Sequence, residues 1–306
     1  MSTGRILAVA SIAGLLLAAP VLPTAADGLK QFKEALRQAP QGVVSYESGK
    51  PFGDNGFILE GVTVKPPPEA AEGIKPEPIN INRITVEDFD FASYRKDEAP
   101  NFMKMRAEGI SFDTKSFDAF DLRDLTGRDR VRADFQLDYR FDPQLKTMTL
   151  NRLELDLHDL ARLELSLALE GINPDDRDAA QSASLRTASL VFEDRSLLGT
   201  ALPAAAKAHG LDPEKIAKLA EEILDSLRPG QGAATIAVLD ALASYVGDYT
   251  HPKGPLRISL NPPGKVPLAA LADIKDPEDA LKRLGLAVSY PGARSPSGAS
   301  RDNPAR

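Results

Sequence analysis

Apolar and polar residues alternate strictly in the middle of the chain. Every odd position from 131 to 141 is apolar: Val131, Ala133, Phe135, Leu137, Tyr139 and Phe141. The even positions between them are polar or charged. Because successive side chains of a strand point to opposite faces, this period of two predicts a strand with one apolar face.

Two more strands continue the pattern. Alternation resumes at Met148, shifts by one position at Asn151-Arg152 and continues through Leu153, Leu155 and Leu157. A one-residue shift inside a strand is typical of a β-bulge. After a turn at His158-Asp159, leucines alternate from position 163 to position 169. We therefore predict three consecutive antiparallel strands with one aliphatic and one charged face.

Shorter alternating stretches flank this meander, beginning near Val43, Phe57, Ile79, Met103, Leu256 and Leu286. Two motifs recur among the strands. Residues 59–64 resemble residues 107–112 and share a Glu-Gly pair, and residues 81–86 resemble residues 150–155 and share an Asn-Arg pair. Two interpretations stay open: three passes of one repeated unit, or chance similarity among alternating strands.

Residues 196–250 change to a helical period. Asp212-Pro213-Glu214 is a typical helix start, and Ile216, Leu219, Ile223 and Leu227 then follow at three- and four-residue spacing. A second helix over 233–246 carries Leu239, Leu242 and Tyr245, and an alanine-rich helix is predicted over 197–209.

These patterns predict an α+β, mainly β protein. We expect an extended, curved antiparallel meander sheet with an α-helical insertion packed on its apolar face. The predicted organisation is a signal peptide over 1–26, a single domain over 27–290 and a disordered tail over 291–306. Within the domain, β repeats span about 43–195, the helical insertion about 196–250, and closing strands with short helices 255–290.

The N-terminus indicates export. Arg5 precedes an apolar segment over residues 6–19, and Thr24-Ala25-Ala26 fits the small-residue rule for signal peptidase. We predict cleavage after Ala26 and a periplasmic protein; the alternative is an uncleaved membrane anchor. The apolar segment is shorter than the roughly 20 residues that a spanning helix needs, which favours cleavage.

Composition narrows the chemistry. The chain has no cysteine, which excludes disulfides, thiolate metal sites and a cysteine nucleophile, and which suits a bacterial periplasm. A net charge of −7 without a basic run argues against nucleic acid as a partner. Histidines at positions 158, 209 and 251 lie in different predicted elements, so we expect no metal site and no cofactor. No catalytic motif occurs, and we expect no enzymatic activity.

The remaining candidate chemistry is apolar. The aliphatic faces of sheet and helices predict either an ordinary core or a groove for an acyl chain, in which each buried methylene contributes roughly 0.8 kcal/mol. The candidate groove residues are Phe135, Leu137, Tyr139, Leu155, Leu165, Ile216, Leu219, Ile223, Leu242 and Tyr245.

The predicted signal peptide, the Leu-Glu-Gly-Val-Thr-Val-like strands, the leucine-alternating strands and the helical insertion together resemble the AsmA-like and YdgA-like envelope proteins of Gram-negative bacteria. The similar part runs from about Val43 to Leu260. The resemblance implies a curved sheet and a role in outer-membrane or lipid homeostasis. Here we expect a cleaved signal in place of the membrane anchor that is common in that group.

Three functional hypotheses follow. The first is a soluble periplasmic protein that binds lipid or another long apolar ligand in envelope homeostasis, with peripheral membrane contact. The second is a structural or interaction protein of the envelope whose helical insertion docks on a partner protein. The third is a periplasmic hydrolase.

Overall fold

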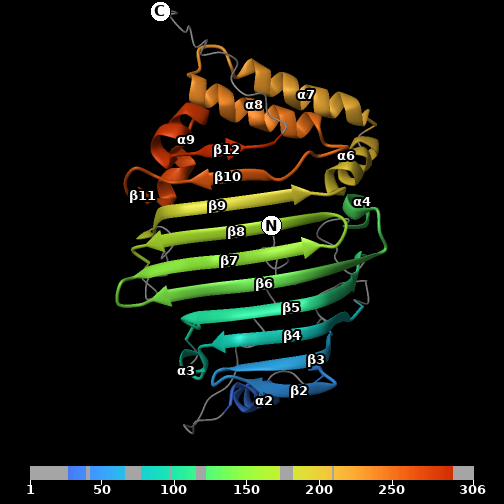
Figure 1. Ribbon diagram of the computed structural model, residues 1–306, viewed down its shortest axis with the longest axis vertical. Coiled ribbons are helices and arrows are strands. Elements are labelled where there is room, and N and C mark those ends of the chain that lie inside the picture. Colours follow the sequence, from blue (N-terminus) through green and yellow to red (C-terminus); the bar gives the residue numbers. More distant parts are fainter. Residues whose placement is uncertain are drawn as a thin grey trace, which may run out of the picture.

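The computed structural model describes residues 27–38, 42–65, 77–96, 98–114, 122–172, 182–208 and 210–291. The predicted signal peptide over 1–26, the predicted tail beyond Pro291 and His209 lie outside the described residues. Within the described ranges, 12 strands form one antiparallel sheet (Figure 1). The prediction of a mainly β protein with a large meander sheet and a helical insertion is confirmed.

The strands follow one another across the sheet almost in chain order. The order is β1-β3-β4-β5-β6-β7-β8-β9-β10-β12, with β2 paired to β3 and β11 paired to β9. Their bounds are β1 (Val44–Ser45), β2 (Ser48–Phe52), β3 (Gly56–Val64), β4 (Ile79–Phe89), β5 (Phe102–Asp113), β6 (Arg130–Asp142), β7 (Thr147–Leu157), β8 (Ala161–Glu170), β9 (Ser184–Asp194), β10 (Leu256–Leu260), β11 (Val266–Pro267) and β12 (Ala287–Ser289).

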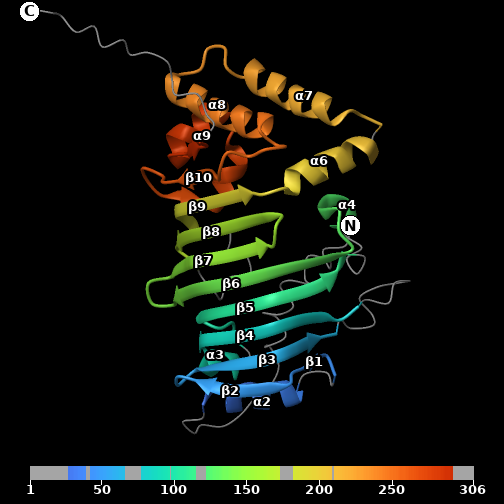
Figure 2. The ribbon, with the colours of Figure 1, turned by 45° about the vertical axis from the view of Figure 1, so that its right-hand side comes forward.

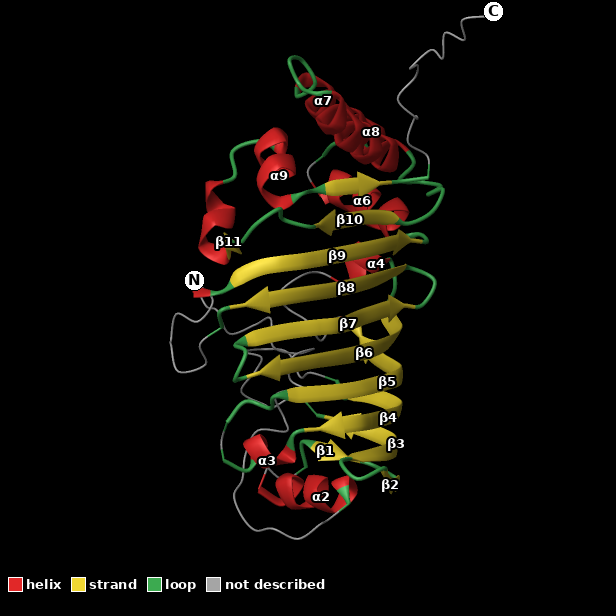
Figure 3. Cartoon of the chain, turned by 60° about the vertical axis from the view of Figure 1, so that its left-hand side comes forward, coloured by secondary structure: helices red, strands yellow, loops and turns green. Residues whose placement is uncertain are grey.

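The described helices gather at the two ends of the sheet and beside the ends of its strands. They are α2 (Gly28–Gln38), α3 (Phe91–Tyr94), α4 (Leu122–Thr126), α6 (Leu197–Ala208), α7 (Pro213–Ser226), α8 (Ala233–Gly247), the 3-10 helix η3 (Leu268–Asp273) and α9 (Pro277–Leu284). Figures 2 and 3 show α2 and α3 at the β2 end, and α6 to α9 at the β12 end. None of the described helices is long and apolar enough to cross a bilayer.

The helical insertion begins where the sequence predicts. Asp212 caps α7 by accepting a hydrogen bond at 3.0 Å from the backbone N–H of Glu214, and Pro213 occupies the first turn. The first N–H groups of a helix lack partners within the helix. The Asp212 carboxylate satisfies one of them, and Pro213 has no N–H that needs a partner. The predicted bounds of α6 to α8 agree with the structure to within one or two residues.

The recurring Glu-Gly and Asn-Arg pairs meet across the sheet. Glu60 on β3 accepts a hydrogen bond at 2.8 Å from Arg83 on β4. Gly109 on β5 has a φ of +65° and lies beside Asn82, and a Cβ at this glycine would collide with the Asn82 amide. The pairing of β5 with β6 shifts register between Ala107 and Ile110. The Glu-Gly motif in β5 is therefore a glycine β-bulge, which increases the local twist of the sheet.

The bulge predicted at Asn151-Arg152 is confirmed. The pairing of β7 with β8 passes from Leu150 opposite Leu167 to Leu153 opposite Leu165, so one side of the ladder carries an extra residue. The bulge restores the phase of the leucines. As a result, Leu150 and Leu153 share one face of the sheet despite their odd spacing.

Candidate functional site

One face of the sheet is apolar from end to end. Paired residues of neighbouring strands point to the same face, so the registers define rows of side chains across the sheet. The central row contains Phe57, Val86, Met105, Leu137, Leu153, Leu165, Leu190, Ile258 and Val288. The adjacent row on the same face contains Leu59, Ile84, Ala107, Phe135, Leu155, Leu163, Phe192 and Leu256.

Helices cover both ends of this face. At the β2 end, the ring of Phe32 on α2 stacks on Phe57 with 4.6 Å between ring centroids, and Phe57 is only 2% exposed. At the β12 end, the ring of Tyr245 on α8 meets the ring of Phe192 edge to face at 6.4 Å. The two ends therefore form two separate buried clusters, one under α2 and one under α8.

Between these ends the face is only half-buried. Leu153, Leu163, Leu165 and Leu190 on β7, β8 and β9 are each intermediate in exposure. Figures 1 and 2 show the described helices at the ends of the sheet and beside its strand ends, not across the middle of these strands. We refer to these four leucines as the central apolar face, and they are the candidate ligand-contacting surface.

The apolar cavity under α2 is too small to be the site. It is lined by apolar residues, among them Phe32, Leu36, Phe57, Ile84 and Met105, and its volume is about 50 Å³. Ligand pockets are typically about 300–1,000 Å³. The gap therefore reflects imperfect packing between α2 and the sheet and is too small for a long apolar ligand.

The structure brings together the sheet residues of the predicted groove. Phe135, Leu137, Tyr139 and Leu155 are half-buried and pack against the cluster under α2. Leu165 belongs to the central apolar face and lies in one row with Leu137. These five side chains share one face.

The helical residues of the predicted groove separate into two sets. Leu242 and Tyr245 on α8 belong to the cluster at the β12 end of the sheet. Ile216, Leu219 and Ile223 lie on α7, which packs beside α6 and α8. Leu219 and Ile223 are 56% and 53% exposed. α8 takes the place next to the sheet and α7 forms an outer layer (Figure 2), so the structure does not bring these three α7 residues together with the sheet residues of the predicted groove.

The two tyrosines of the predicted groove differ in hydrogen bonding. The Tyr139 hydroxyl donates to the carbonyl oxygen of Pro100 at 3.0 Å, and burial raises its pKa to about 12. Burial also raises the pKa of Tyr245, with a further contribution from the negative charge of Asp194. The Tyr245 hydroxyl is buried and has no hydrogen-bond partner among the described residues. Sequence periodicity alone could not distinguish these two hydroxyls.

Asp90 is a buried carboxylate that periodicity did not single out. Its Oδ1 accepts from the backbone N–H groups of Ala92 and Ser93, and its Oδ2 accepts from the backbone and side-chain amides of Asn101. Burial opposes its ionisation, but the hydrogen bonds from Ser93 and Asn101 outweigh burial and lower its pKa. Asp90 ties α3 to the start of β5, which is a structural role.

His158 pairs with a carboxylate that is distant in the sequence, not with the adjacent Asp159. Its Nε2 lies 3.0 Å from Oδ2 of Asp134, whose Oδ1 accepts a hydrogen bond at 2.7 Å from the N–H of Gly109. Asp159 instead lies 3.5 Å from Arg128. The His158–Asp134 pair thus connects the β7–β8 turn with the β5 bulge. Among the described residues, no group of three or more histidines and carboxylates is placed to hold a metal ion.

Ion pairs cover the opposite face of the sheet. Asp156 binds Arg195 through two contacts of 2.8 and 3.1 Å, and Arg162 lies 3.2 Å from Glu154 and 2.7 Å from Glu164. Glu154 is 7% exposed, and its Oε2 makes no hydrogen bond with the described residues. This face therefore presents a mutually neutralising network, in contrast to the apolar face behind it.

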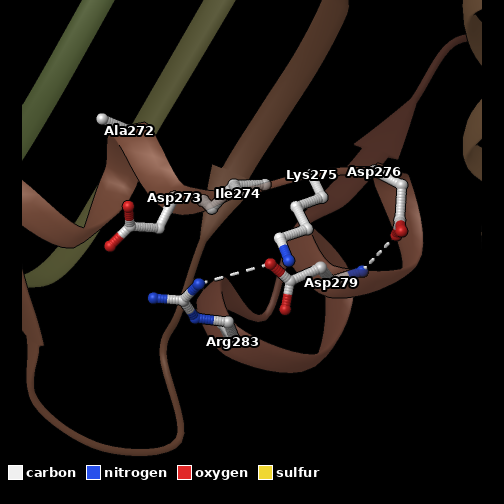
Figure 4. Close-up of a pocket in the computed structure, with 7 residues that line it drawn as sticks. All are labelled: Ala272, Asp273, Ile274, Lys275, Asp276, Asp279 and Arg283. Carbon is white, nitrogen blue, oxygen red and sulfur yellow. Dashed lines mark hydrogen bonds and ion pairs between the residues drawn. The ribbon is translucent and has the colours of Figure 1, made fainter.

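A polar hollow of about 780 Å³ lies where η3 leads into α9 (Figure 4). Asp279 accepts a hydrogen bond from Arg283 at 3.3 Å, and Asp276 caps α9 by accepting from the N–H of Asp279 at 2.8 Å. Both carboxylates are therefore occupied by the local structure. We assign no ligand to this hollow.

Comparison with known proteins adds little on function. A family model described as "Uncharacterized protein" matches residues 154–291. The match runs from β7 through the helical insertion to the end of the sheet. No curated protein matches the chain.

Proposed function

We propose that the central apolar face binds a long apolar ligand, such as the acyl chain of a lipid, in the periplasm. The observation that carries the proposal is the half-buried run of leucines on β7, β8 and β9 between two ends that helices bury. Contiguous apolar surface of this kind on a soluble protein marks an interaction site more often than it occurs by chance.

The chemistry of the face limits what it can recognise. On β7, β8 and β9 its rows contain leucines and one phenylalanine, and the charged side chains point to the other face of the sheet. Burial of methylene groups would supply the affinity, at roughly 0.8 kcal/mol for each. We therefore expect the face to select ligands by chain length and shape, with weak preference among polar headgroups. The expected export and the resemblance to AsmA-like and YdgA-like proteins remain predictions that point to the envelope.

The test is binding of oleate and of dioleoyl phosphatidylethanolamine, followed by native mass spectrometry and by thermal melting. Leu165→Asn should weaken binding by about tenfold or more, because the ligand would have to desolvate a new amide. Ser166→Ala is the matched control, since Ser166 is the next residue on β8 and points to the opposite face. If wild type forms no lipid complex and shows no shift in melting temperature, the proposal is wrong.

A second candidate function is docking of a protein partner on α7. The observation that favours it is the exposure of Leu219, Ile223 and Leu227, which are 56%, 53% and 41% exposed in one stripe along the helix. Single exposed leucines are common on protein surfaces, but a stripe of aliphatic residues along an outer helix is typical of a surface that binds another helix.

A further inference from the structure

The outer helix α7 presents an apolar stripe to solvent. Ala217 is buried, and α7 packs against α8 and α6. Ile216, Leu219 and Ile223 follow at helical spacing; Ile216 is half-buried at the edge of this stripe, and Leu219 and Ile223 are more than half exposed. Figure 2 shows α7 at the outer end of the molecule, with α8 between it and the sheet.

Charges beside the stripe are arranged with opposite sign at its two ends. Lys215 and Glu222 are seven residues apart, and therefore lie on the same side of the helix, about two turns apart. Both side chains are exposed. One flank of α7 is thus basic near its N-terminus and acidic near its C-terminus.

Such a flank is complementary to itself when two copies of the helix run antiparallel. A two-fold axis perpendicular to both helices brings the same flank of each copy together in reverse order. With the axis near Leu219, that residue would contact Leu219 of the second copy, and Ile216 would face Ile223 of the second copy. In the same register, Lys215 of each copy lies near Glu222 of the other, so two ion pairs form on one flank.

We infer that the partner of α7 is a second copy of this chain, paired antiparallel through the Ile216–Leu219–Ile223 stripe. This inference rests on the second candidate function and is independent of lipid binding by the sheet. A membrane surface fits α7 less well. Helices that lie on membranes are rich in lysine and arginine, whereas α7 carries Glu214, Glu221, Glu222 and Asp225 against two lysines.

The test is sedimentation velocity of the purified exported protein over a range of concentrations. A contact through one helix is small, so we expect a monomer–dimer equilibrium, not a permanent dimer. Leu219→Asp should abolish the dimer. Leu145→Ser is the control, because Leu145 is 70% exposed in the distant turn between β6 and β7, and this change should leave the equilibrium unaltered.

Charge exchange tests the antiparallel register. An exposed ion pair typically shifts an equilibrium by up to about fivefold, and each substitution alters two ion pairs related by the two-fold axis. Lys215→Glu alone and Glu222→Lys alone should each weaken dimerisation by about tenfold, since attraction becomes repulsion. The double variant should return to within about threefold of wild type, because the pairs reform with reversed sign.

Several results would overturn the inference. A wild type that is monomeric at every concentration would do so, as would a dimer that both single charge variants leave unchanged. Binding to anionic phospholipid vesicles that Leu219→Asp abolishes, in a protein that is monomeric in solution, would assign the stripe to a membrane instead. None of these results bears on oleate binding by Leu165, so the two proposals fail separately.

Discussion

The two helices of the insertion should respond in opposite ways to the same substitution. Leu239 on α8 is 1% exposed and belongs to the layer against the sheet, whereas Leu219 on α7 is 56% exposed. Replacing a buried leucine by alanine removes transfer free energy and leaves a cavity, which together cost about 2–5 kcal/mol. Replacing an exposed leucine leaves no cavity, and alanine is itself a good helix former.

The expected magnitudes are well separated. For a domain of this size, 1 kcal/mol shifts the melting temperature by roughly 2–4 °C, so Leu239→Ala should lower it by roughly 4–20 °C. Leu219→Ala should change the free energy of unfolding by no more than about 0.5 kcal/mol, or roughly 2 °C. The assay is thermal melting followed by far-ultraviolet circular dichroism, with urea unfolding as a second measure.

The protein concentration matters for this comparison. If α7 pairs with a second copy, the dimer adds stability that depends on concentration, so the melts should be run dilute enough that wild type is monomeric. A loss of 2 kcal/mol or more for Leu219→Ala under these conditions would refute the reasoning, since it would mean that the α7 stripe is buried within one chain. An unchanged melting temperature for Leu239→Ala would refute the assignment of α8 to the core.

Three further outcomes are expected. Gly109→Ala should destabilise the fold by more than about 1 kcal/mol in urea unfolding, because φ is +65° and the new Cβ meets Asn82, whereas Gly264→Ala, with open space around it, should be neutral. The pKa of Asp90 is lower in the folded protein than in the unfolded chain, where it is near 4, so ionised Asp90 stabilises the fold above about pH 4 and this stability is lost as the pH falls through the folded pKa. Asp90→Asn should therefore be most destabilising near neutral pH and should approach wild type in acid, as measured by urea midpoints across pH. A double-mutant cycle on Asp156 and Arg195 should give a coupling free energy of about 1 kcal/mol, and a value indistinguishable from zero would mean that their two-contact pair is too exposed to matter.

The alternation of side chains was a strong predictor of the central sheet because its cause is local. Alternate residues of a strand point to the same face because of the strand's own geometry, independently of distant parts of the chain. For that reason the bounds of β6 and β8 and the bulge at Asn151-Arg152 agree with the structure. The same locality explains the start of α7, where Asp212 and Pro213 act on the first helical turn itself.

The partners of the charged residues could not be predicted from the local sequence. Asp156 and Glu154 alternate identically with leucines, yet Asp156 is held by two contacts to Arg195 and Glu154 is almost fully buried beside Arg162. His158 finds its partner in Asp134, which lies 24 positions earlier in the sequence. Which charged residues pair across strands depends on the register and twist of neighbouring strands, and the sequence of one strand does not specify these.

The sequence by itself determined which residues alternate, where the chain turns, where the helices begin, and that one face of the sheet is aliphatic, because each of these depends on neighbours within a few positions. Only the tertiary structure decided which part of that face is covered. Both α7 and α8 carry an aliphatic stripe in the sequence, but α8 packs on the sheet and leaves α7 outside, with Leu219 exposed and Leu239 buried. Burial is a property of what lies opposite a side chain, and that is fixed by contacts between elements distant in sequence. The two proposed surfaces, the central apolar face and the α7 stripe, are therefore visible as apolar patterns in the sequence and as open surfaces only in the fold.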